Sequence, residues 1–264
     1  GDEISDANFE ETVANSNILK LFELRKWCED LMNEAIYVPD AVAYMEKRQE
    51  AKVKNPDVIQ RQSGSERLLF DNMFDNEMNV LVHEAFAHYS NTSYKLALKS
   101  GFYDFTSARD FYREATKAAG IGMHQDLVRK FVELQALLLT PIAPHWAEYI
   151  WLEVLKNKET VQKALWPRVP EPNASLTAAR EFVRTTQTNI TSAEGNAIKK
   201  LSKGKAATFD PKKEKKIIIF AAKEWPAWQK KYIDMLRDAE TIDIKAISKS
   251  IDKSESKKAM PFIN

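Results

Sequence analysis

Residues 140–151 read TPIAPHWAEYIW and place two prolines in one of the most apolar stretches of the chain. Proline lacks a backbone N–H and clashes with the preceding turn, so Pro141 is expected to end a helix. The apolar stripe of that helix is Leu127, Phe131, Leu134 and Leu138. Pro144 instead suits the first position of a new helix, whose apolar positions are Ala147, Ile150, Trp151 and Val154. The stretch predicts a buried corner between two helices, anchored by Trp146 and Trp151.

Residues on the N-terminal side of this corner show the same helical periodicity. Asn8 and Glu11 are spaced like a capping box and predict the start of a helix. The stripe of this helix is Leu21, Leu24, Cys28, Leu31 and Ala35. Ser63 and Glu66 predict the start of a second long helix in the same way. The stripe of the second helix is Phe70, Phe74, Met78, Leu81 and Ala85.

The remaining signals of the first half are helix ends and starts. VPD at 38–40 is expected to stop the first helix, and residues 44–67, with few large apolar side chains, are expected to be exposed. Gly101 is expected to close a short segment, and Ser107 with Asp110 to open another helix that ends at Gly120. Four or five amphipathic helices with short connections predict a helical bundle over residues 8 to about 160.

The composition shifts after LWPRVPEPN at 165–173. One helix is expected from Leu176 to about Ser192, and EKKIIIFAA at 214–222 is the one convincing strand signal. We expect a helix over EWPAWQKKYIDML to pack its tryptophans, Trp225 and Trp228, on that strand. Because a lone strand is not stable, we predict a mainly α protein with two domains: a helical bundle over 1–170, and over 171–264 the truncated start of an α+β domain.

The bulk composition excludes several classes of protein. The 264 residues are 44% hydrophobic, enough for a core, and carry a net charge of only +1. A single cysteine, Cys28, cannot form an internal disulfide, and its place in a helical stripe predicts a packing role. No apolar run approaches the roughly 20 residues that span a bilayer. The acidic start without an initiator methionine suggests a piece of a longer protein.

Two short motifs resemble catalytic sites but have the wrong spacing or place. HEAFAH at 83–88 suggests a zinc protease, yet its histidines are five residues apart, and that motif needs four. KLSKG at 200–204 resembles the ATP-binding KMSKS loop of class I aminoacyl-tRNA synthetases, but it follows the bundle, whereas in that family the loop precedes it. No glycine-rich phosphate loop is present. We therefore expect no catalytic residue, metal or cofactor in this chain.

A basic segment is the best candidate for a binding site. Residues 196–216 contain eight lysines against Asp210 and Glu214, a net charge of +6. Such a run is either a solvated loop or a surface that contacts nucleic-acid phosphates without reading sequence. A second, more diluted basic set over 47–67 favours a solvated face. The predicted nucleic-acid-binding residues are Lys199, Lys200, Lys203, Lys205, Lys212 and Lys213.

Several of these segments resemble one enzyme family. LLLTPIAPHWAEYIW resembles the LLxPxAPHxAEExW segment in the anticodon-binding helical domain of class I aminoacyl-tRNA synthetases, and LWPRVPEPN resembles the Trp-Pro segment after it. DANFEETVANSNILKLFEL at 6–24 and KKIIIFAAKEWPAWQKKYIDML at 215–236 are similar to the leucyl-tRNA synthetases of archaea and the eukaryotic cytosol. The resemblance covers nearly the whole chain, and the later segment favours the leucine enzymes.

The resemblance implies the tRNA-binding part of an ATP-dependent, cytoplasmic ligase. Its partners would be leucine-accepting tRNA, held mainly by its body and long variable arm, and the rest of the synthetase polypeptide; no membrane or DNA is implied. ATP would bind the catalytic domain, whose HIGH segment has no counterpart here. Two alternatives stay open: a helical protein-interaction module, or the same part of an isoleucyl-, valyl- or methionyl-tRNA synthetase.

Overall fold

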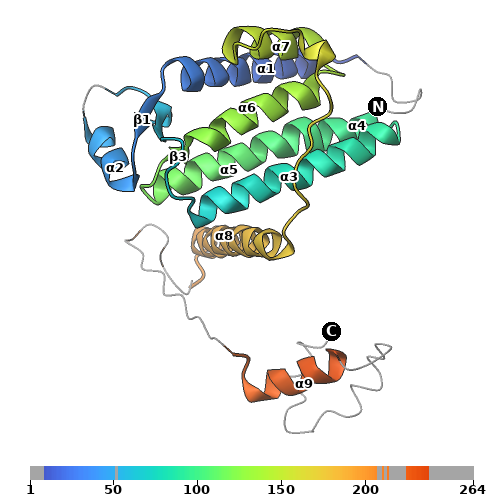
Figure 1. The fold of residues 1–264 in the computed structure, drawn as a ribbon. Coiled ribbons are helices and arrows are strands. Elements are labelled where there is room, and N and C mark those ends of the chain that lie inside the picture. The colour runs from blue at the N-terminus through green and yellow to red at the C-terminus, as the bar shows by residue number, and fades with distance from the viewer. Residues whose placement is uncertain (1–8, 51–52, 207–209, 211–212, 214–223, 238–264) are drawn as a thin grey trace. The chain divides into compact units, whose positions relative to one another are not determined.

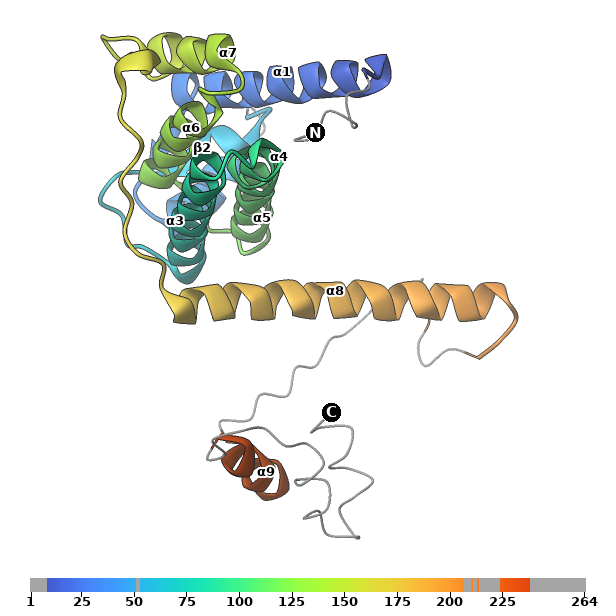
Figure 2. The ribbon, with the colours of Figure 1, turned by 90° about the vertical axis from the view of Figure 1, so that its right-hand side faces the viewer.

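The computed structural model describes residues 9–50, 53–206, 210, 213 and 224–237. The chain divides into two compact units, Gly1–Ser192 and Ala193–Asn264. The first unit contains a helical bundle with a short sheet at its side (Figures 1 and 2). The domain boundary that the sequence suggests at 170 stays a prediction, and the predicted strand at 214–222 lies outside the described residues.

The first unit is built mainly from α-helices. Helices α3, α5 and α6 lie side by side, and α1 and α7 lie together across one side of them (Figures 1 and 2). Its helices are α1 (Glu11–Asn33), α2 (Ala41–Gln49), α3 (Leu69–Ser90), α4 (Tyr94–Leu98), α5 (Phe105–Ala118), α6 (Gln125–Leu139) and α7 (Pro144–Tyr149), and α8 (Ala174–Ser202) begins in this unit and continues into the second. The prediction of a mainly α bundle is confirmed.

The core confirms the helical stripes. Most of the predicted apolar positions of α1, α3 and α6 are buried in one cluster. Its members from these stripes are Leu24, Cys28, Leu31, Phe74, Met78, Leu81, Ala85, Leu127, Phe131, Leu134 and Leu138. Burial raises the pKa of the Cys28 thiol to about 12, against a smaller opposing effect of Arg109. A thiol that stays protonated at neutral pH agrees with a packing role for this cysteine.

The proline corner has the predicted form. Helix α6 ends at Leu139, before Pro141, and Pro144 is the first residue of α7. The π-helical segment η4 (Ile150–Val154) continues α7, and Ile150 is fully buried. The two tryptophans are only half-buried. The indole N–H of Trp146 donates to the Leu21 carbonyl at 2.9 Å, and that of Trp151 donates to the Glu159 carbonyl at 3.0 Å.

Two helix boundaries differ from the predictions around Gly101. The chain does not end a helix there, because the π-helical segment η3 (Lys99–Asp104) joins α4 to α5. The Gln135 side-chain amide donates to the Gly101 carbonyl at 2.8 Å, which stabilises this irregular turn. Ser107 therefore lies inside a continuous helix and opens none. The helix end at Gly120 is confirmed, with the left-handed φ of +70° that glycine adopts without strain.

A three-stranded parallel sheet was not predicted. Its strands are β1 (Ile36–Val38), β2 (Ile59–Arg61) and β3 (Met123–His124), in the order β1-β2-β3. Residues 44–67 are thus not uniformly exposed: they include β2 and the 3₁₀ turn η2 (Pro56–Val58). Gln60 is buried and donates from its side chain to the Leu31 carbonyl at 2.8 Å, so β2 also caps the end of α1.

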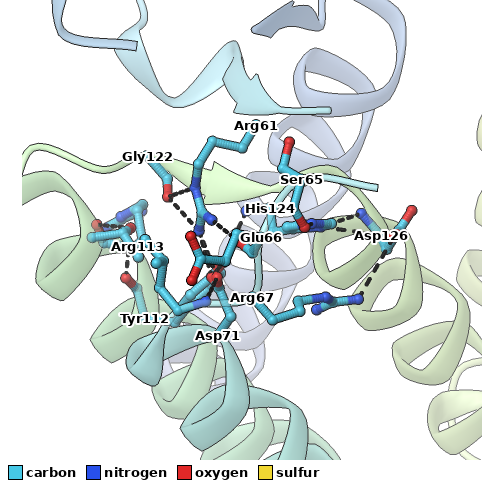
Figure 3. Close-up of polar contacts among 12 residues, drawn as sticks. Arg61, Ser65, Glu66, Arg67, Asp71, Tyr112, Arg113, Gly122, His124 and Asp126 are labelled. Carbon is cyan, nitrogen blue, oxygen red and sulfur yellow. Dashed lines mark hydrogen bonds and ion pairs between the residues drawn. The ribbon is translucent and has the colours of Figure 1, made fainter. Parts of the chain in front are cut away.

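A buried ion pair joins β2 to α3 (Figure 3). Arg61 and Asp71 are 2% and 0% exposed, and Nη2 of Arg61 lies 2.6 and 2.7 Å from the two carboxylate oxygens. The Arg61 guanidinium also donates to the carbonyls of Glu66 and Gly122. Asp71 in turn accepts the backbone N–H of Leu68 at 2.7 Å and caps α3. Helix α3 therefore begins at Leu69, and the predicted start at Ser63 is wrong.

Tyr112 and His124 extend this network to α5, β3 and α6 (Figure 3). The Tyr112 hydroxyl donates to Asp71 and accepts the backbone N–H of His124 at 2.8 Å. Burial and the Asp71 charge hold the pKa of Tyr112 well above its usual value, so the phenol stays a donor.

Gly122 approaches Tyr44 so closely that an added Cβ would lie 2.4 Å from the Tyr44 ring, and the φ of +69° at Gly122 also favours glycine.

His124 is the N-cap of α6 and must be neutral to act as one. Its Nδ1 accepts the Asp126 N–H at 3.2 Å, while Nε2 lies 3.2 Å from the Ser65 carbonyl and therefore carries the proton. The ring is 1% exposed, and burial, followed by the charge of Arg67, lowers its pKa. A second proton would remove the acceptor that caps the helix.

Asp71→Asn tests the ion pair. The change leaves the Arg61 charge buried without its counterion, so the free energy of unfolding in urea should fall by about 3–5 kcal/mol. The matched control is Asp75→Asn, which breaks a half-exposed pair with Lys130 and should cost less than about 1 kcal/mol. Equal losses in the two variants would contradict a dominant role for the buried pair.

His124 should also make the bundle less stable in acid. Because its pKa is lowered by folding, the unfolded chain takes up the proton first, and the contribution of the neutral ring is lost as pH falls below about 6.5. His124→Asn keeps a capping acceptor that does not titrate. Between pH 7 and pH 5, the parent should therefore lose more free energy of unfolding than this variant does. A difference independent of pH would refute the assignment.

Candidate nucleic-acid interface

The structure places four of the six predicted lysines at one helix end. Helix α8 extends to Ser202, ten residues beyond its predicted end, so Lys199 and Lys200 lie in its last turns and are not in a loop. Lys203 and Lys205 follow directly, and all four side chains are exposed. Lys213 is also exposed, whereas Lys212 lies outside the described residues.

The local sequence explains why α8 ends at this point. Gly204 has a φ of +66°, and its N–H donates to the Leu201 carbonyl at 3.0 Å. The N–H of Lys205 donates to the Lys200 carbonyl, also at 3.0 Å. Together these bonds form a helix C-cap in which the glycine adopts the left-handed backbone conformation. Lysines in the last turn are favourable there, because the carboxyl end of a helix carries a partial negative charge.

The four lysines around this helix end are suited to phosphate contact. Four ammonium groups within seven residues provide flexible positive charges, and none of the four forms an ion pair within the described ranges of the chain. Such groups neutralise phosphates from several directions but carry no information on base identity. The four lysines form the candidate interface, referred to below as the α8 lysine cluster: Lys199, Lys200, Lys203 and Lys205.

The second basic set, over residues 47–67, is largely bound within the fold. Lys47 pairs with Glu50 at 2.8 Å on the surface, and Arg48 donates to the Lys117 carbonyl. Arg61 is fully buried, so its prediction as part of a solvated face is wrong; its role is the ion pair with Asp71. A single arginine in a polar segment gives no sign that its partner lies ten residues later in a helix.

The HEAFAH motif forms no metal site in the described part of the chain. His83 lies 3.3 Å from the Pro170 carbonyl, and no group of three His, Cys, Asp or Glu side chains in the described part is arranged to hold a metal ion. Among the described helices, none is long and apolar enough to cross a membrane. Trp225, predicted to be core, is 60% exposed. The α8 lysine cluster is thus the feature that most favours a binding role.

Comparison with known proteins identifies the family. The family model described as the anticodon-binding domain of tRNA ligase matches residues 71–209, which include most of α3, all of α4 to α8 and the α8 lysine cluster. A cytoplasmic leucine–tRNA ligase of Neurospora crassa is 47% identical over all of this chain, and that of Saccharomyces cerevisiae is 39% identical. The enzyme of Pongo abelii is 29% identical, again over all of this chain.

The match covers only part of these relatives. The chain spans 22% of the length of the Neurospora and Saccharomyces proteins and 21% of the Pongo protein. The matched family model, in contrast, covers more than half of this chain and includes the proline corner at 140–151. The chain therefore belongs to the family of anticodon-binding domains of tRNA ligases.

Proposed function

We propose that the chain is the tRNA-binding part of a cytoplasmic leucine–tRNA ligase. The observation that carries the proposal is similarity along the whole chain, at 47% and 39% identity, to proteins named as cytoplasmic leucine–tRNA ligases. Its partners would be leucine-accepting tRNA and the rest of a longer synthetase polypeptide. ATP and leucine would bind that remainder, where the chemistry takes place.

The contribution of this chain would be positional. A ligase gains rate when its substrate is held with the reacting end in place, and contacts far from that end supply the binding energy. The α8 lysine cluster supports such a role, because it presents four exposed cations at the end of one helix. Lysine contacts to phosphates would hold the tRNA body without reading the anticodon, as the resemblance to the leucine enzymes implies.

The proposal also limits what this chain does by itself. The described residues contain no glycine-rich phosphate loop, and the KLSKG sequence forms the end of α8, where Gly204 terminates a helix. An ATP site would need converging backbone N–H groups or a cationic loop over the phosphates. We therefore assign binding, and not adenylate formation, to this part.

Removing the α8 lysine cluster should weaken tRNA binding. Each lysine that neutralises a phosphate releases condensed counterions. The quadruple change of Lys199, Lys200, Lys203 and Lys205 to Ala should therefore lower the slope of log K against log salt by about one unit for each phosphate that is no longer neutralised. Affinity for leucine-accepting tRNA is measured by filter binding between about 50 and 200 mM salt. The decrease should be the same for tRNAs with altered anticodons.

The matched control removes three other exposed lysines, Lys156, Lys158 and Lys163, by changing each to Ala. This variant should keep the parental salt slope, and both variants should keep the parental melting temperature within a few degrees. An unchanged slope in the quadruple variant would show that the cluster is a solvated surface that does not contact tRNA. Tighter binding of isoleucine-accepting tRNA than of leucine-accepting tRNA by the parent chain would overturn the leucine assignment.

The isolated chain should form no leucyl-adenylate. With ATP, leucine and leucine-accepting tRNA, pyrophosphate exchange and aminoacylation should stay at the level of a reaction without protein, because the sequence contains no glycine-rich phosphate-binding motif. A full-length leucine–tRNA ligase in the same buffer serves as the positive control. Pyrophosphate exchange above background would show that adenylate formation was wrongly assigned to the rest of the synthetase polypeptide.

A further inference from the structure

Helix α1 exposes large apolar side chains in its N-terminal half. Ile18, Leu19 and Phe22 are 65%, 55% and 52% exposed, and Val13, earlier in the helix, is 52% exposed. Figure 2 shows this half of α1 extending past α3, α5 and α6, so these helices do not cover it. Exposed apolar side chains that stand singly need no explanation, but a group of them is typical of a surface that contacts another molecule.

Three of these side chains share one face of the helix. Each residue advances an α-helix by about 100°, so Ile18, Leu19 and Phe22 lie within an arc of about 100°. Leu24 and Leu31, which α1 buries in the bundle, lie on the opposite side. A helix with apolar residues on both sides is typically buried between two bodies. The residues Ile18, Leu19 and Phe22 are referred to below as the α1 outer face.

The α1 outer face ends at a polar rim on its C-terminal side. The Arg25 guanidinium lies 5.2 Å from the centre of the Phe22 ring and 5.3 Å from that of the Tyr149 ring, which belongs to α7. Glu29 holds this arrangement, because it accepts the Tyr149 hydroxyl at 2.8 Å and pairs with Arg25 at 3.5 Å. An apolar centre beside a polar rim is the usual anatomy of an interface between proteins.

The charges around this face do not favour a nucleic acid as its partner. The α1 outer face itself carries no charge, whereas contact with phosphates needs cations. The two cations that follow it along α1 are each paired with an acid: Arg25 with Glu29, and Lys26 with Asp30 at 3.3 Å. The occupant that this face fits is therefore an apolar protein surface.

The comparisons favour the rest of the polypeptide as that occupant. The chain spans 22% of the length of its Neurospora and Saccharomyces relatives, so most of such a protein lies outside it. A surface on the same polypeptide meets α1 at a high effective concentration, which a second copy or a separate protein does not. A ligase also needs a fixed geometry between the part that holds tRNA and the part that reacts, and an apolar contact between domains supplies it.

We propose that the α1 outer face docks the rest of the synthetase polypeptide, through an apolar surface of that polypeptide. The contact holds the helical bundle against the part in which the chemistry takes place. Ile18, Leu19 and Phe22 are then positioning residues, because they touch no substrate and act only through the contact. The inference rests on the proposed function, in which both parts belong to one ligase.

Thiol labelling tests the contact directly. Ile18→Cys and Phe22→Cys place a reactive group on the α1 outer face, and the control Val42→Cys places one on an exposed position of α2. Cys28 does not interfere, because it is fully buried and its pKa is raised to about 12. Labelling by iodoacetamide, read by mass spectrometry of peptides, is compared between the 264-residue chain and the full-length polypeptide that contains it.

The full-length polypeptide should protect only the α1 outer face. Labelling at positions 18 and 22 should be slower by about tenfold or more than in the 264-residue chain, because a contact that opens only transiently shields its residues, while position 42 should be unaffected. Equal rates in the two proteins at positions 18 and 22, or equal slowing at all three positions, would overturn the proposal. Protection that appears in the 264-residue chain and grows with its concentration would assign the face to a second copy instead.

A charge on the α1 outer face should uncouple aminoacylation from its separate steps. In the full-length polypeptide, Phe22→Glu should preserve pyrophosphate exchange with ATP and leucine, and also the affinity for leucine-accepting tRNA. It should lower kcat for aminoacylation by about tenfold or more, because the reacting end of the tRNA is then misplaced. The matched control, Val42→Glu, should keep all three. Circular dichroism checks the fold, and Ile18→Glu replaces Phe22→Glu if that variant does not fold.

The outcomes separate this inference from the proposed function. If the full-length parent charges no leucine-accepting tRNA, the proposed function is wrong, whatever the labelling shows. If the parent charges that tRNA and Phe22→Glu charges it equally well, the docking contact alone is wrong.

Discussion

The buried pair of Arg61 and Asp71 is the constraint on which the first unit depends. One carboxylate neutralises the arginine of β2, caps α3 through the Leu68 N–H and accepts the Tyr112 hydroxyl of α5. Such a pair gains little over an apolar pair of the same size, but it is costly to break. Its value is therefore geometric: it specifies how the sheet, α3 and α5 meet, and mispaired arrangements would leave a buried charge.

The same constraint accounts for the irregular segment between α1 and α3. A sheet of strands two or three residues long cannot be stable alone, so its order must come from the bundle. Arg61 ties β2 to α3, Gln60 ties it to the end of α1, and the Tyr112 hydroxyl holds the His124 backbone of β3. Because His124 then caps α6, the start of the helix that leads to the proline corner is linked to the same network.

The helices were predictable and the sheet was not, for physical reasons. Pro141 and Pro144 act through their own backbone, so their roles follow from local sequence, and the α6 stripe follows from helical periodicity. Arg61 can be buried because Asp71 and the carbonyls of Glu66 and Gly122 surround it, and no local sequence pattern reveals this arrangement. Likewise, a glycine at position 101 is typical of a helix end, but the Gln135 side chain stabilises a π-helical turn that continues the helix there. At the candidate interface the lysines were predictable as a cluster, and their helical setting was not.

That helical setting gives Lys199 and Lys200 two separable effects. At the end of α8 they face a partial negative charge, which stabilises the helix by about 0.3–1 kcal/mol each at low salt. Contact with tRNA phosphates would instead enter the salt slope of binding. Lys203 and Lys205 lie beyond the helix end and should contribute mainly to binding. Changing only Lys203 and Lys205 should therefore lower the salt slope while the helix content measured by circular dichroism stays constant. A drop in helix content with an unchanged slope would show instead that these two lysines serve the fold.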